Sequence, residues 1–139
     1  MKTITSFLLK FALAASVLAL IFRYFLSYGI ENKAPMIIIV SSVLYGVAMF
    51  INGFYFGKKD SEYLPIYDVG FRFHFTTYLI HNTISELWFI LGFKSPYEKI
   101  EVVHVTTLIW GIFLIIHFIF FLRTRKNTIN SLNKEDLFE

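Results

Sequence analysis

Four long apolar segments constrain this chain more than any other feature. Charged residues lie mostly between these segments, which cover about residues 7–28, 35–57, 72–93 and 102–122. About 20 apolar residues in a helix cross the hydrocarbon core of a bilayer. Helices are favoured there because backbone polar groups in lipid must bond within the protein. The sequence therefore predicts an all-α integral membrane protein, a four-transmembrane-helix bundle with short loops.

The composition supports a membrane protein and narrows the function classes. Of the 139 residues, 56% are hydrophobic and 19% aromatic, and the mean hydropathy is +0.61. A soluble domain of this length would be less apolar. The chain has no cysteine, which excludes disulfides, thiol catalysis and iron–sulfur clusters. Its basic residues lie at segment ends rather than among aromatics, so we expect the lipid bilayer, not nucleic acid, as a partner.

The distribution of basic residues predicts the orientation. With four spans, both termini and the middle connection share one side, which holds nine of the 13 lysines and arginines. Basic residues are enriched on the cytoplasmic side of membrane proteins. We therefore expect a multi-pass protein with both termini cytoplasmic, made of one membrane domain (residues 1–122) and a polar cytoplasmic tail (123–139). Lys10 interrupts the first apolar stretch, so we interpret residues 7–28 as a retained span rather than a cleaved signal peptide.

The third segment is polar on one side only. At about 3.6 residues per helical turn, its polar stripe and the flanking positions hold His74, Thr77, Tyr78, His81, Asn82, Ser85, Glu86 and Trp88. The opposite side holds Leu79, Ile80, Ile84, Leu87, Ile90 and Leu91. We expect Leu79, Ile80, Ile84 and Leu87 to touch lipid, and His81, Asn82 and Ser85 to be buried against other helices.

Glu86 and Arg23 are the charges expected deepest in the bilayer. Measured from the inner end of each span, both lie at a similar height, about 21 and 25 Å at 1.5 Å per residue. A carboxylate in the hydrocarbon core costs about 2.5–3.5 kcal/mol unless it is paired or neutralised. Two interpretations stay open. Arg23 and Glu86 form an ion pair that docks two helices, or Glu86 is a working proton or cation site.

The other intramembrane polar groups give further candidates. Asn52 lies on the second segment and His117 on the fourth. Two facing histidines could hold a b-type haem, but no E-x-x-H spacing suggests a metal centre. We assign no catalytic residue, metal site or cofactor. The polar intramembrane candidates are Glu86, His81, Asn82, Tyr78, His74, Arg23, Asn52 and His117.

Two short motifs resemble known families of small membrane proteins. The run "FINGFYFGKK" (50–59) is similar to span ends in the GtrA-like family, whose four-span members are implicated in moving lipid-linked sugars. The set "IFRYF" (21–25), Asn52 and "FTTYLIHNTISE" (75–86) is similar to the small fluoride channels. The glycine-rich helices and the compact threonine–phenylalanine–serine run of those channels are absent here. Neither resemblance assigns a functional residue.

These observations lead to three functional hypotheses. The first is a transporter or channel subunit for an ion or small solute, with a polar path lined by the third span. The second is a non-catalytic structural or accessory subunit of a membrane complex. The third is a haem-binding redox protein. We expect no enzyme, because no catalytic motif is found, and we expect a homo-oligomer or a partner membrane subunit.

Overall fold

The chain folds into four long helices. The computed structural model describes the backbone of residues 4–62 and 64–135, which contains α1 (Ser6–Glu31), α2 (Pro35–Asp60), α3 (Ile66–Ile90) and α4 (Ile100–Glu135). The prediction of an all-α chain with four helices is therefore confirmed. Three of the helices in the described residues, α1, α2 and α4, are long and apolar enough to cross a membrane. The polar stripe of α3 sets it apart from them.

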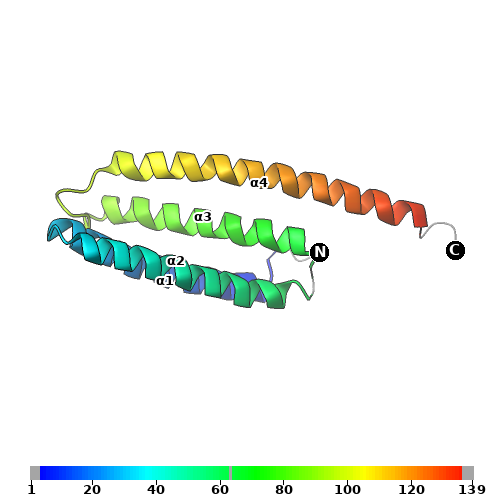
Figure 1. The fold of residues 1–139 in the computed structure, drawn as a ribbon, viewed down its shortest axis with the longest axis horizontal. Coiled ribbons are helices and arrows are strands. Elements are labelled where there is room, and N and C mark those ends of the chain that lie inside the picture. Colours follow the sequence, from blue (N-terminus) through cyan, green and yellow to red (C-terminus); the bar gives the residue numbers. More distant parts are fainter. Residues whose placement is uncertain (1–3, 63, 136–139) are drawn as a thin grey trace.

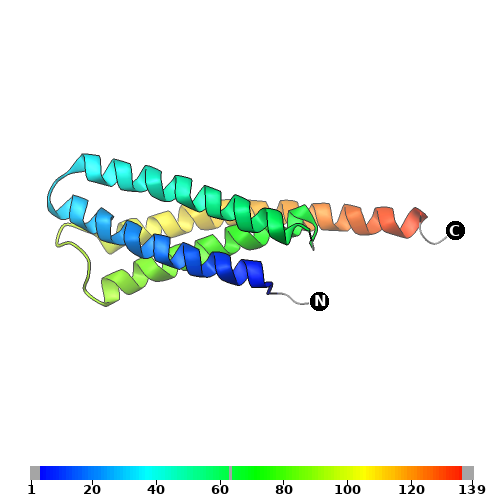
Figure 2. The same cartoon turned by 90° about the horizontal axis from the view of Figure 1, so that it is seen from below.

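Successive helices run antiparallel, so the described chain begins and finishes at the same end of the bundle (Figures 1 and 2). We call this the terminal end, and it also carries the α2–α3 connection. The opposite loop end carries the α1–α2 and α3–α4 connections. α4 continues past the other three helices at the terminal end, and its helix runs through the expected tail as far as Glu135.

Local sequence explains where the first two helices start and how closely they approach. The Thr5 hydroxyl accepts the Leu8 N–H at 3.1 Å and so caps the start of α1. Pro35 opens α2, where its missing N–H costs nothing. A Cβ on Gly29 would lie 2.8 Å from Ile38 Cγ1 of α2, so a larger residue would force Ile38 to move at this crossing.

The helices are arranged in layers with α3 in the middle. α1 packs against both α2 and α3, and α4 lies along α3 on the side away from α1 and α2 (Figure 1). Among the described residues, α4 makes helix-to-helix contact with α3 alone. The backbone of α4 is therefore farther from α1 and α2 than from α3.

A small apolar core fills the terminal half of the bundle. Phe11, Ala15, Val69 and Phe73 are buried there, and the rings of Phe11 and Phe73 lie 4.7 Å apart. Ile80 packs against this cluster. Ile80 is therefore half-buried rather than fully exposed, because α1 covers this part of α3. Leu79 and Leu87 are exposed as expected, and Ile84 is half-buried.

The outer surface is apolar almost throughout. α2 buries a single residue, Asp60, and its large apolar side chains are exposed along most of the helix. Monomeric soluble proteins rarely expose apolar patches larger than a few hundred Å². This surface suits lipid or a protein partner.

The helix order makes a topological prediction. In a chain that spans the bilayer four times, cysteines placed at Ser61 and Lys126 react with an impermeant thiol reagent from one side. A cysteine at Lys94 reacts from the other side. The chain has no native cysteine, so each variant reports one site. Labelling of Ser61→Cys and Lys94→Cys from the same side would contradict the fold in the membrane.

Candidate functional site

One side of the α3 polar stripe is joined to α4 by a row of polar contacts. His74, Tyr78, Asn82 and Glu86 recur every four residues along α3 and meet α4 residues in reverse order. We call this row the α3–α4 ladder. Its contacts are His74 Nδ1 to His117 Nδ1 at 2.9 Å, Tyr78 Oη to the Thr107 carbonyl at 3.4 Å, Asn82 Oδ1 to Thr107 Oγ1 at 2.5 Å, and Glu86 Oε1 to His104 Nε2 at 3.1 Å.

The histidine contact of the ladder has a defined proton arrangement. The Trp110 indole N–H donates to His74 Nε2 at 2.8 Å, so that nitrogen carries a lone pair. Neutral His74 then carries its proton on Nδ1 and donates it to His117 Nδ1. These hydrogen bonds are all satisfied when both histidines are neutral. The two Nδ1 atoms are in direct hydrogen-bond contact, which leaves no space for a metal ion between them.

Glu86 does not pair with Arg23, and the expected ion pair was wrong. Glu86 meets His104 instead, and its side chain is 36% exposed. α3 ends at Ile90, so Glu86 lies one turn, about 6 Å, from the helix end. Its carboxylate is therefore near the edge of the bundle rather than at mid-height.

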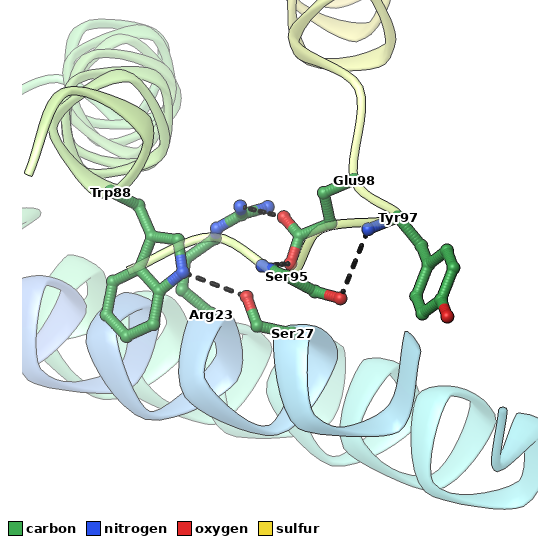
Figure 3. Close-up of polar contacts among 6 residues, drawn as sticks. All are labelled: Arg23, Ser27, Trp88, Ser95, Tyr97 and Glu98. Carbon is green, nitrogen blue, oxygen red and sulfur yellow. Dashed lines mark hydrogen bonds and ion pairs between the residues drawn. The ribbon is translucent and has the colours of Figure 1, made fainter. Parts of the chain in front are cut away.

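The partner of Arg23 is Glu98, which comes from the α3–α4 connection. Arg23 Nη2 lies 2.6 Å from Glu98 Oε2, and the two side chains are only 6% and 5% exposed (Figure 3). The Ser95 backbone N–H donates to the other oxygen, Glu98 Oε1, at 3.3 Å. The ring of Phe89 lies 5.5 Å from the guanidinium carbon, within cation–π range. The connection thus folds inward and fixes its carboxylate against α1.

A short motif could have revealed this contact. Ser95-Pro96-Tyr97-Glu98 matches the S-x-x-E pattern in which a glutamate side chain reaches back to the N–H of the serine. The structure contains this hydrogen bond. The motif restricts Glu98 to the inside of a turn, which the division of the chain into spans and short loops does not show. Trp88 adds a second link at this end, since its indole N–H donates to Ser27 Oγ at 2.8 Å (Figure 3).

The other side of the α3 polar stripe faces a cavity of about 290 Å³ between α4 and the α1–α2 pair. All four helices contribute to its wall. The polar lining residues are Arg23, Ser42, Tyr45, His81, Asn82, Ser85 and Thr106, and the apolar ones are Phe22, Leu26, Val102 and Val103. Three predicted candidates, Arg23, His81 and Asn82, therefore meet at one place.

Tyr45 and His81 organise the polar wall of the cavity. The Tyr45 hydroxyl lies 3.1 Å from His81 Nδ1, and the Tyr45 ring stacks on Phe22 with centroids 4.6 Å apart. Ser85, one turn further along α3, is 2% exposed. The wall thus combines a guanidinium, hydroxyls and an imidazole, which suits hydrogen bonding to a ligand rather than covalent catalysis.

The remaining candidates lie outside the cavity. His74, Tyr78, His117 and Glu86 belong to the α3–α4 ladder, and Asn52 donates to the Ala48 carbonyl within its own helix at 3.3 Å. Among the described residues, no three His, Asp or Glu side chains are grouped to hold a metal ion.

Asp60 is a buried charge that the sequence did not single out. It ends α2, is 0% exposed, and neither carboxylate oxygen has a hydrogen-bond partner in the described part of the chain. It lies at the terminal end of the bundle and does not line the cavity. We therefore assign it no part in the candidate site.

Comparisons with known proteins add no assignment. No protein-family model, no curated protein and no solved structure matches this chain. The geometry of the cavity and its wall is therefore what indicates a function.

The Arg23–Glu98 pair makes a stability prediction. Removal of one partner of a buried ion pair leaves an uncompensated charge and costs about 3–5 kcal/mol. Arg23→Gln and Glu98→Gln should each lower the free energy of unfolding by about this amount, and the double variant should recover most of the loss.

The control for this cycle is Arg23→Gln combined with Glu86→Gln. Arg23 and Glu86 do not touch, so their effects should add. Thermal or denaturant unfolding of the purified variants in detergent measures both cycles. A larger coupling of Arg23 to Glu86 than to Glu98 would contradict the described pairing.

Proposed function

We propose that this protein is a four-span membrane carrier for a small solute, with the cavity between the four helices as its binding site. The cavity is the single observation that carries the proposal. Small-molecule sites are concave and mostly apolar, with a few placed polar groups. The cavity has this character and draws residues from all four helices.

The membrane placement of α3 follows from its neighbours. α1, α2 and α4 are apolar enough to span a bilayer, and α3 lies between α4 and the α1–α2 pair. Its polar side chains meet partners inside the bundle, which lowers the cost of placing them in lipid. We therefore propose that α3 is the fourth span.

Basic residues suggest the orientation. Of the 12 lysines and arginines in the described residues, eight lie toward the terminal end and four toward the loop end. By the positive-inside rule, the terminal end is cytoplasmic, and both termini with it.

Two features favour a carrier over an open channel. Toward the terminal end, the packed rings of Phe11 and Phe73 and the side chain of Val69 fill the space between α1 and α3. Toward the loop end, the Arg23–Glu98 pair joins α1 to the α3–α4 connection. Passage of a solute along α1 toward either end therefore needs movement of these groups. α4 contacts α3 alone, so it is the helix least restrained against such movement.

An accessory subunit is the second candidate, and the α3–α4 ladder favours it. Every polar residue of the ladder has a partner on α4, which suits a purely structural role. An accessory subunit needs no cavity that exchanges solute. The two candidate functions therefore differ in whether the protein increases solute permeability.

Solute permeability of reconstituted liposomes tests the proposal. Light scattering after an osmotic step reports the entry of small carboxylates, amides, polyols and amines, without prior choice of the solute. We expect the protein to accelerate entry of at least one solute. Ser85→Phe should abolish this acceleration, because the added ring occupies the cavity.

Thr83→Phe is the matched control, since Thr83 lies two residues away on α3 with an exposed side chain. It should leave permeability unchanged. No acceleration for any solute, or equal loss in both variants, would reject the carrier and favour the accessory subunit.

A further inference from the structure

The charge of the cavity wall indicates which ligand it takes. Of the described residues that line the cavity, Arg23 is the one with a permanent charge, and no carboxylate is among them. The other polar groups are hydroxyls, the Asn82 amide and the His81 imidazole. Arg23 is paired with Glu98, which does not line the cavity. The charged group that faces the cavity is therefore the guanidinium, which attracts an anion and repels a cation at short range.

Arg23 also has unused hydrogen-bonding capacity. Its Nη2 donates to Glu98, but its buried Nε has no hydrogen-bond partner in the described part of the chain. A buried donor without an acceptor costs about 1–3 kcal/mol, so such groups are normally bonded to protein, water or a ligand. Arg23 is buried and lines the cavity. Nε itself is covered, so an acceptor in the cavity would satisfy this donor after a small shift of the guanidinium.

The remaining walls limit the size and character of the ligand. A volume of about 290 Å³ is at the small end for ligand pockets. Phe22 and Leu26 of α1 and Val102 and Val103 of α4 are its apolar lining residues, which suits a ligand with a short hydrocarbon group. Tyr45 and Ser85 offer hydroxyls near the charged side.

We propose that the cavity binds a small monoanionic carboxylate, whose oxygens accept from Arg23 while a short apolar group lies against Phe22 and Val103. This inference deepens the proposed carrier and rests on the same cavity. The required chemistry is an anionic oxygen group, which a soluble acid or the phosphate of an anionic lipid could supply. Glu98 partly neutralises the charge of Arg23 and competes with the ligand, so the ion pair lowers the affinity of the cavity for an anion.

Binding of three matched probes tests this assignment. Propionate, propionamide and propylammonium have similar size and differ in charge. With the protein in phosphatidylcholine nanodiscs, isothermal titration should show saturable propionate binding, at least tenfold weaker propionamide binding, and no propylammonium binding. Equal or tighter binding of the amide or the amine would overturn the proposal.

Variants separate the charge effect from unfolding. Glu98→Gln should tighten propionate binding by threefold or more, because Arg23 loses its competing partner. The Arg23→Gln and Glu98→Gln double variant removes both charges, should remain folded, and should lose propionate binding by at least tenfold. Lys99→Gln is the control, since Lys99 is an exposed cation outside the cavity, and it should bind like the parent. Unchanged binding in the folded double variant would overturn the role of Arg23.

Lipid composition distinguishes the two sources of the anion. Replacement of one third of the phosphatidylcholine by phosphatidylglycerol should leave propionate binding unchanged if the ligand is a soluble acid. If phosphatidylglycerol weakens propionate binding and this effect depends on Arg23, the anion that the site binds is a lipid phosphate instead.

Binding and transport can fail separately. If propionate binds but no solute crosses the membrane, the proposed carrier is rejected and the anion site stands. If an amine crosses the membrane and Ser85→Phe blocks this transport, the proposed carrier stands and the anion site is rejected.

Discussion

The pairing of polar side chains on α3 is the interaction on which the rest of the structure depends. A polar group in hydrocarbon costs several kcal/mol unless it has a partner. α3 carries polar residues on about half of its surface, so it is stable in lipid only when other helices cover that half. α4 covers one side through the α3–α4 ladder, and α1 and α2 approach the other. The layered order of the bundle satisfies this requirement.

The two sides of the polar stripe have different consequences. Toward α4 the contacts join side chains directly, from His74 and His117 to Glu86 and His104. This side holds two helices together. Toward α1 and α2 the contacts are fewer, and a cavity remains beside Ser85 and His81. The buried Arg23–Glu98 pair fixes the α3–α4 connection near this cavity. A single amphipathic helix thus supports both a structural and a proposed binding role.

The sequence predicts the helices and the polar stripe but not the partners. The apolar segments are long enough to place four helices, and the period of α3 separates its two sides. The predicted Arg23–Glu86 pair was wrong because heights along ideal spans cannot show that the α3–α4 connection folds inward. In the sequence, only the spacing from Ser95 indicates that Glu98 turns inward, because its carboxylate accepts a hydrogen bond from the Ser95 N–H. Ile80 was assigned to lipid because the sequence does not show that α1 covers that part of α3. Pairing between distant segments depends on packing, which a single sequence does not contain.

The central claim is that the cavity beside Ser85 admits small polar molecules within the membrane-embedded bundle. Reactivity of single cysteines tests it most directly, because the native chain has none. With the protein in lipid nanodiscs, a water-soluble methanethiosulfonate reagent should modify Ser85→Cys and leave Thr83→Cys, on the exposed side of α3, largely unmodified. Propionate should slow the modification of Ser85→Cys. Faster reaction at Thr83→Cys, or no reaction at Ser85→Cys, would contradict an accessible polar cavity.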